Sequence, residues 1–252
     1  MDNHKGPLVS GFVYRGLLKG IVVTTVIITV LLFVLIPKSN ILVANAKKSW
    51  AAGNASRIAM GYAAYTLATK AAISTPQQNQ TGTRFTGTAH DINDVAFILA
   101  QKAGLNDAKV WFISSDDALA GAEIPRLVIS GNIQAATVVT KDFANLTKSW
   151  TFVIGLPLEA PTSTTPLLWT YGLQHNGKWS EASPWDGRGG HIAFLDGHVE
   201  WFDQLSTAPK ERGLTVYPTN RNPGTMTADW GQAIPSSGKL WAQVKNLDGR
   251  GK

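Results

Sequence analysis

Apolar and polar residues follow three successive patterns along this chain, and the first is a run that is apolar on every side. Residues 20–36, with the sequence GIVVTTVIITVLLFVLI, carry no charge. With Leu17 and Leu18 they approach the roughly 20 apolar residues that a helix needs to cross a bilayer. A buried core helix is the alternative, but such a run has no polar side for water. We therefore predict a transmembrane helix over 17–36, preceded by a leader-like segment over 1–16.

The second pattern is helical and apolar on one face only. Its apolar positions recur at alternating spacings of four and three residues, which is typical of an amphipathic helix. These positions are Ala51, Ala55, Ile58, Tyr62 and Tyr65. We predict that residues 37–72 continue the first helix, with a kink at Pro37 because proline lacks the N–H that a helix uses.

The third pattern predicts a short helix and a small antiparallel sheet. The sequence HDINDVAFILAQKAG reads as a helix with Asp91 as its N-cap and Gly104 just past its end. Strand-like runs follow: KVWFIS, RLVISG, ATVVT, SWTFVIGL and LLWTYGL. We expect an α+β fold, in which the long N-terminal helix packs on an antiparallel sheet within a globular domain over 73–205. The tail, 206–252, is rich in Pro, Gly and Asn and predicts loops.

Residues 191–202, HIAFLDGHVEWF, predict a β-hairpin with a two-residue turn at Asp196 and Gly197. In this register Ile192, Phe194, Val199 and Trp201 share one apolar face. The other face carries His191, Ala193, Leu195, His198, Glu200 and Phe202. His198 and Glu200 would then be neighbours, but two ligands do not make a zinc site. A solvated hairpin face is therefore preferred to a metal or catalytic site.

Composition and charge narrow the classes of function. Charged residues make up 16% of the chain, the formal net charge is +6, and there is no cysteine. No run of basic residues resembles a nucleic-acid-binding arm, so no nucleic-acid partner is expected. Lys5, Arg15 and Lys19 precede the predicted span, which places the N-terminus in the cytoplasm. The alternative is a signal peptide cleaved after the small-x-small sequence ANA, so that the mature chain starts at Lys47.

The usual catalytic arrangements are missing from the sequence, so no enzyme is expected. There is no G-x-S-x-G elbow, no H-E-x-x-H motif and no phosphate-binding loop. The histidines have no pair at helical ligand spacing, and His175, His191 and His198 could converge only through the fold.

Several stretches resemble the type IV pilins and the type II secretion pseudopilins. Within that family the chain is similar to the branch whose C-terminal signature is called H-x9-DG. The resemblance lies in LIPKSNILVANAKKSWAAGNASRIAMGYAAYTLAT, LNDAKVWFISSDD, TPLLWTYGL and GGHIAFLDGHVEWF. It implies a pilin-like fold, with a long helix packed on a small sheet and the Asp-Gly hairpin as the family marker.

The resemblance also implies a processing site for a prepilin peptidase, in one of two alignments. Aligning on Pro37 starts the mature chain at Gly16 and puts Gly20 where the family carries a glutamate. Aligning on Gly11 and Phe12 puts Gly16 at that position instead, so neither alignment supplies the acid. The residues of the expected processing site are Gly11, Phe12, Arg15, Gly16 and Gly20.

The signature hairpin comprises Asp186, His191, Asp196, Gly197, His198 and Glu200, with Asp186 at the position of the family's histidine. Calcium stabilises a loop near the C-terminus in some family members. The candidate ligands here are Asp186, Asp196 and Glu200, and ordinary turn carboxylates are the alternative. No other cofactor is implied.

The resemblance implies a non-enzymatic subunit of a type II secretion or type IV pilus-like system. Such a subunit would sit in the inner membrane by a single span, with its globular domain periplasmic or extracellular. Its partners would be other pilin-like subunits, in a homo- or hetero-oligomer. The alternative is a membrane-tethered binding module or adhesin, because Trp169, Trp179, Trp185 and Trp201 gather around the hairpin in the sequence.

Overall fold

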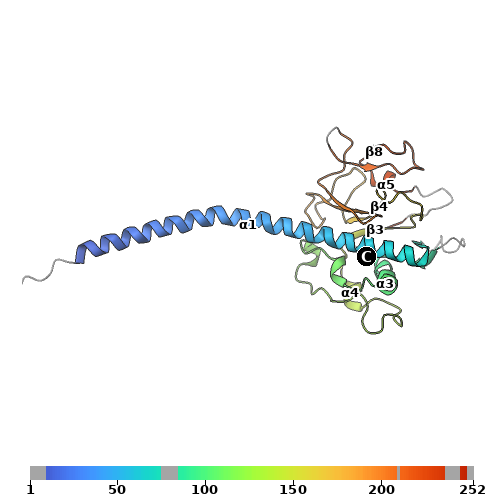
Figure 1. Cartoon of the computed structure of the whole chain (residues 1–252), viewed down its shortest axis with the longest axis horizontal. Coiled ribbons are helices and arrows are strands. Elements are labelled where there is room, and N and C mark those ends of the chain that lie inside the picture. The colour runs from blue at the N-terminus through green and yellow to red at the C-terminus, as the bar shows by residue number, and fades with distance from the viewer. Residues whose placement is uncertain (1–9, 75–84, 209–210, 236–244, 249–252) are drawn as a thin grey trace, which may run out of the picture. The chain divides into compact units, whose positions relative to one another are not determined.

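The computed structural model describes residues 10–74, 85–208, 211–235 and 245–248, with no side chains described for 10–20, 28–41, 85–86 and 245–247 (Figure 1). The chain divides into two units, residues 1–48 and 49–252. The α-helices are α1 (Ser10–Thr69), α3 (Ile92–Ala103), α4 (Lys141–Asn145) and α5 (Trp230–Ala233), and the 3-10 helices are η1 (Ala108–Trp111) and η2 (Asp117–Leu119). The strands are β1 (Ala72–Ser74), β2 (Phe85–Thr88), β3 (Trp150–Ile154), β4 (Pro166–Thr170), β5 (Gly190–Phe194), β6 (Val199–Phe202), β7 (Leu214–Thr215), β8 (Met226–Thr227) and β9 (Lys245–Asp248).

The first unit consists of the N-terminal part of α1, and it overturns the prediction of a membrane span. α1 is continuous from Ser10 through Pro37. Within the described residues, however, no helix has the length and apolar character needed to cross a membrane. The predicted span over 17–36 and the single-pass inner-membrane location are therefore contradicted.

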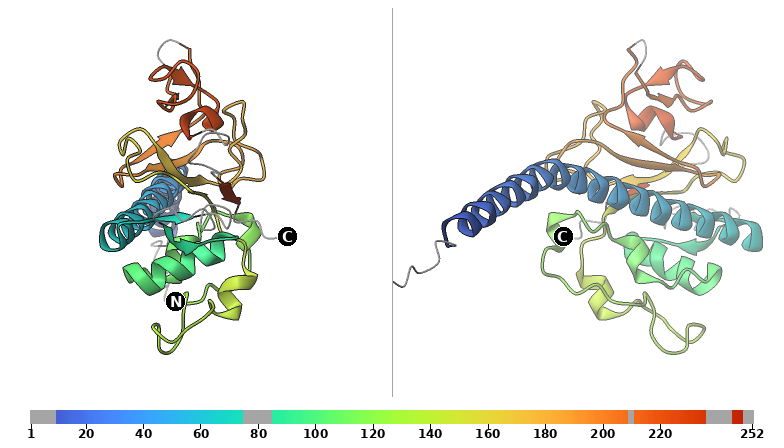
Figure 2. Two further views of the ribbon diagram at one scale, coloured as in Figure 1. Left: turned by 90° about the vertical axis from the view of Figure 1, so that its right-hand side faces the viewer. Right: turned by 60° about the vertical axis from the view of Figure 1, so that its left-hand side comes forward.

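The second unit confirms the predicted amphipathic stripe. Ala51, Ala55, Ile58, Tyr62 and Tyr65 are all buried. This part of α1 lies between the sheet and α3 (Figures 1 and 2). On the sheet side the ring of Tyr62 meets Phe152 of β3 edge-on, at 5.8 Å between centroids. On the other side Gly61 approaches Leu105, which follows α3, so closely that an added Cβ would lie 3.2 Å from it.

Helix α3 confirms its predicted end signals. The side chain of Asp91 accepts a hydrogen bond from the backbone N–H of Asp94, which satisfies an otherwise unpaired donor of the first turn. Gly104 ends the helix with φ of 72°, in the left-handed region that glycine adopts without a steric penalty.

The main sheet has five strands in the order β6-β5-β4-β3-β9, and every neighbouring pair is antiparallel. All residues of β3, β4 and β5 are buried, so the centre of the sheet forms the core with α1. The predicted α+β class with a small antiparallel sheet is therefore confirmed.

Three predicted strands are wrong. KVWFIS begins as the 3-10 helix η1. Its backbone then bonds to Ser149, which precedes β3: the Trp111 carbonyl accepts from Ser149 N–H, and Ile113 N–H donates to Ser149 Oγ. RLVISG and ATVVT make only scattered loop contacts, such as the bridge of Leu127 to Asp107 and the bond from Thr140 N–H to Val128 O. Apolar content alone did not distinguish these segments from strands.

The predicted hairpin is confirmed, but its register is wrong by one residue. Phe194 N–H donates to the His198 carbonyl, so the loop holds three residues, 195–197, rather than two. Gly197 takes φ of 89°, as expected for a three-residue loop with a left-handed last position. Ile192 therefore faces Glu200 and His191 faces Trp201. A slip of one residue reverses the faces of one strand relative to the other, so the predicted all-apolar face does not exist.

The tail contains more regular structure than the predicted loops. β7 pairs with β8, α5 follows them, and β9 joins the main sheet beside β3. The pairing of Val153 with Asn246 and of Phe152 with Leu247 places a strand from the end of the chain at the sheet edge.

Candidate functional site

Exposed apolar side chains on the first unit's part of α1 form the strongest candidate surface. Ile21, Val22, Val23, Val26 and Ile27 are each 54–57% exposed. They point in several directions around the helix rather than along one face, because consecutive residues are separated by about 100°. Burying such side chains stabilises a protein by roughly 1.5–3 kcal/mol each, so uncovered ones favour association.

The polar groups within this segment do not oppose burial. Thr25 Oγ1 donates to the Ile21 carbonyl at 2.9 Å, one turn earlier. A threonine bonded in this way requires no water, so it can be covered by a partner without leaving an unpaired hydroxyl. Further along α1, Leu42 and Val43 are also exposed. We call residues 21–27 with Leu42 and Val43 the apolar segment of α1.

The residues of the expected processing site lie in α1 at the backbone level. Gly11, Phe12, Arg15, Gly16 and Gly20 all fall within Ser10–Thr69, and their side chains lie outside the described residues. Processing by a prepilin peptidase therefore stays a prediction.

The hairpin tip contacts α1 directly. Ser56 Oγ donates to the Gly197 carbonyl at 2.9 Å, across 141 residues of sequence. A Cβ on Gly197 would lie 3.3 Å from Met60 of the same helix. The Asp-Gly turn, expected as a marker, thus packs the end of the hairpin on α1.

The three carboxylates proposed as calcium ligands each pair with a different basic side chain. Asp186 pairs with Arg188 at 2.7 Å, Asp196 pairs with His198, and Glu200 pairs with Arg212. Across the described residues, no three side chains of His, Asp or Glu gather in a way that could hold a metal ion. The calcium site stays a prediction without a ligand cluster to support it.

The hairpin histidines have separate environments. His198 stacks on Phe194 with an interplanar angle of 6° and 4.2 Å between centroids, as expected for side chains on the same face. His191 is buried between Trp185 and Trp201, with ring centroids 6.0 and 4.8 Å away.

The tryptophans around the hairpin pack largely into the core. Trp169, Trp179 and Trp185 are buried and Trp201 is partly exposed. Gly189 and Gly190 allow this packing, since a Cβ on Gly190 would lie 2.5 Å from the Trp179 ring. These side chains do not provide the exposed aromatic platform that a sugar-binding adhesin would use.

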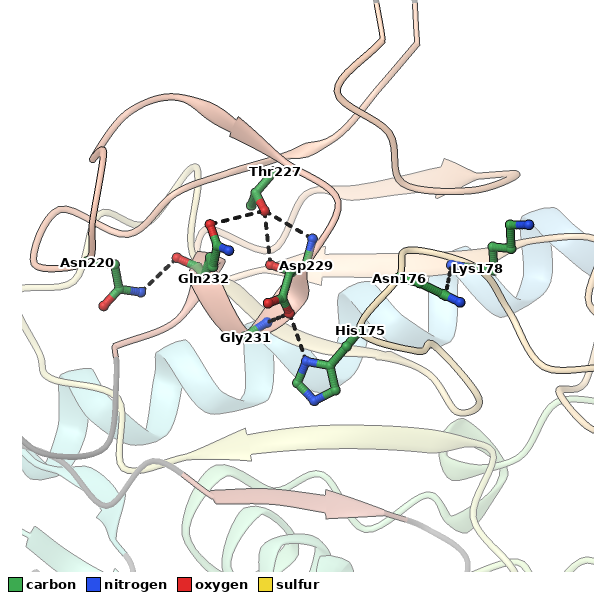
Figure 3. Close-up of polar contacts among 8 residues, drawn as sticks. All are labelled: His175, Asn176, Lys178, Asn220, Thr227, Asp229, Gly231 and Gln232. Carbon is green, nitrogen blue, oxygen red and sulfur yellow. Dashed lines mark hydrogen bonds and ion pairs between the residues drawn. The ribbon is translucent and has the colours of Figure 1, made fainter.

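A histidine–aspartate pair that the sequence did not reveal lies away from the hairpin (Figure 3). His175 Nδ1 lies 2.8 Å from Asp229 Oδ1, although 54 residues separate them in sequence. Asp229 Oδ1 also accepts from Gly231 N–H at 2.9 Å and so caps α5. The His175 ring lies 4.1 Å from the Trp230 ring, which in turn meets Trp169 at 5.4 Å.

A dense set of hydrogen bonds holds Asp229 in place. Thr227 Oγ1 accepts from Asp229 N–H at 3.0 Å, and Asn220 Nδ2 donates to the Gln232 carbonyl at 2.8 Å (Figure 3). The result is an exposed imidazole held in one orientation by Asp229. The Thr227 hydroxyl is bonded within the loop: Oγ1 accepts from Asp229 N–H and lies 3.5 Å from Gln232 Oε1.

His175, His191 and His198 therefore do not share a described site. His175 pairs with Asp229, His198 pairs with Asp196, and His191 lies between two tryptophans. The signal for Asp229 was its position just before a short helix, where an N-cap is favoured. Nothing in the sequence indicated that His175 would reach it.

Comparison with known proteins gives no relative: no protein-family model, no curated protein and no solved structure matches this chain.

Proposed function

We propose that this protein is a non-enzymatic, pilin-like subunit that assembles with other pilin-like subunits through the apolar segment of α1. The system would be a type II secretion or type IV pilus-like machine. One observation carries the proposal: an apolar stretch of a single helix is exposed on all sides, while the same helix is packed into an α+β unit further along.

The packing of the second unit supports this proposal. α1 is fixed there by the buried stripe, by Ser56 on the hairpin tip and by the ion pair of Arg57 with Asp107 at 3.0 Å. A helix anchored in this way presents its other part to partners while the folded unit remains intact.

Cysteine cross-linking tests the proposal, because the chain contains no cysteine of its own. Val26→Cys places a thiol in the apolar segment, and Val138→Cys places one on an exposed site of the second unit. In cells of the native host, we expect Val26→Cys to form disulfide-linked or bis-maleimide-linked products with another pilin-like subunit, identified by mass spectrometry.

Val138→Cys is the matched control and should remain uncross-linked. Val26→Asp should abolish the assembly, while Val138→Asp should leave it intact. Equal behaviour of the two positions, whether both cross-link or neither does, would contradict assembly through α1.

A further inference from the structure

All of the chain's excess positive charge lies on α1. This helix carries six basic residues and no acidic residue: Arg15, Lys19, Lys38, Lys47, Lys48 and Arg57. The whole chain has 23 basic and 17 acidic residues, so the rest of it holds 17 of each and is formally neutral. The charge is thus a property of the helix that carries the exposed apolar segment.

A helix whose charged residues are all Lys or Arg is poorly suited to pair with a second copy of itself. In either orientation and in every register, no charge on one α1 would find a carboxylate opposite on the other, because the helix carries no acidic residue. Like charges in contact oppose association, and the opposition extends about 10 Å at 0.1 M salt. Arg57 is neutralised by Asp107, but Lys47 is exposed.

The second unit does not supply the missing carboxylates. Several of its acidic side chains already face a base of the same unit, as in Asp186 with Arg188 and Glu200 with Arg212. A second copy therefore offers an apolar helix of the wrong charge and, outside α1, equal numbers of basic and acidic residues.

We propose that the partner of α1 is a different protein, with an apolar surface bordered by Asp and Glu side chains. The inference rests on the proposed function, since it names the kind of subunit that binds the apolar segment. Lys19 and Lys38 are 19 residues apart and bracket the uncharged stretch. Helical rise separates them by about 28 Å, so the partner's carboxylates should flank an apolar contact of that length.

Apolar burial and charge have separate roles in this interaction. The apolar segment supplies affinity, because its side chains leave water on binding. The cations supply selectivity: they disfavour a second copy and favour an acidic surface. The chain is therefore expected to occupy a position in a mixed assembly rather than to polymerise alone.

A copy of the protein with reversed charge can serve as the acidic partner. The full-length triple variant Lys19→Glu, Lys38→Glu and Lys47→Glu keeps the apolar segment and replaces its cations. The matched control variant, Lys102→Glu, Lys141→Glu and Lys178→Glu, makes the same charge change at exposed sites of the second unit. Sedimentation velocity of fluorescent wild-type protein would be measured alone and with each variant, at 50 mM and 500 mM salt.

We expect the wild type to bind the acidic copy roughly tenfold more tightly than itself at 50 mM salt, since up to three ion pairs replace contacts between like charges. The preference should shrink at 500 mM salt and be absent with the control variant. Self-association as strong as the mixed binding, or equal binding of the control, would overturn the inference and leave assembly through α1 intact.

Two further outcomes also overturn it. Vesicles of an anionic phospholipid that displace the acidic copy would identify lipid, not protein, as the preferred anionic partner. An absence of association in every mixture, unchanged by Val26→Asp, would remove the proposed function together with the inference.

Discussion

The two parts of α1 are both apolar, but only one of them is buried against other parts of the same chain. Between Ala51 and Tyr65 the apolar side chains recur on one face, and the sheet and α3 bury them. Between Ile21 and Ile27 they occur on all faces and remain exposed. Within this helix, the apolar residues that recur with a helical period are buried against the same chain, and the described apolar residues without such a period are exposed.

The largest difference should appear when one isoleucine is truncated in each part. Ile58→Ala removes a fully buried side chain and leaves a cavity, so the free energy of unfolding should fall by about 2–5 kcal/mol. Ile27→Ala alters an exposed side chain and should change it by less than about 0.5 kcal/mol. Urea unfolding of both variants measures the difference, and similar losses would break the comparison.

A buried lysine should make the free energy of unfolding depend on pH, and an exposed lysine serves as its comparison. Lys148 is buried, and its ammonium donates to the carbonyls of Phe143, Ala144 and Leu146 at the end of α4. Burial lowers the pKa of Lys148 to about 8, below its usual 10.5. The folded protein then binds fewer protons than the unfolded chain between these values, so stability rises with pH across that window.

The expected gain from pH 7.5 to 10.5 is roughly 3 kcal/mol relative to Lys148→Met, which cannot titrate. Lys47→Met is the exposed control and should follow the wild-type pH dependence. Chemical denaturation at several pH values gives both slopes. A wild-type curve parallel to that of Lys148→Met would show that the carbonyl groups hold the ammonium charged throughout.

Two glycines of α1 offer the same contrast on one helix. Gly61→Val would force a branched side chain against Leu105 and should cost about 1–3 kcal/mol in stability. Gly53 has open space where its Cβ would be, so Gly53→Ala should stabilise the helix by about 0.5–1 kcal/mol. The midpoint temperature of thermal unfolding should fall for Gly61→Val and rise for Gly53→Ala. A lower midpoint for Gly53→Ala would show that the added methyl group meets a neighbouring atom.

The smallest expected effect concerns the contact of α1 with the hairpin tip. Ser56→Ala removes the hydrogen bond to the Gly197 carbonyl and should cost about 1 kcal/mol. Ser56→Thr keeps the hydroxyl and serves as the conservative control. Amide hydrogen exchange in the hairpin loop should quicken in the alanine variant alone; unchanged exchange would mean that the contact does not hold the tip.

Local signals in the sequence predicted the second part of α1 and helix α3 well, because caps and periodicity act within one turn, but the short helices η1, α4 and α5 were not predicted. The stripe from Ala51 to Tyr65, the N-cap Asp91 and the final Gly104 all lie where the pattern placed them. The hairpin was found through its Asp-Gly pair, but its register depends on loop length. The carbonyl of His198 pairs with Phe194, which a two-residue turn would not allow.

Contacts distant in sequence could not be predicted in the same way. The pair of His175 with Asp229 depends on the turn before Trp179 meeting a loop near the C-terminus. Asp116 is similar: its buried carboxylate accepts from Ser149 Oγ at 2.7 Å and from Tyr171 Oη at 2.6 Å. No local sequence pattern marks Ser149 or Tyr171 as a partner of Asp116, since each is an ordinary residue at the end of a strand.

The contact between Ser56 and Gly197 has a consequence for biosynthesis. The helix leaves the ribosome 141 residues before the hairpin tip that it must meet. At typical elongation rates this delay is on the order of ten seconds or more, during which the stripe from Ala51 to Tyr65 has no native cover. The nascent chain therefore exposes two apolar surfaces for that interval, and only one of them can be closed by completing the chain.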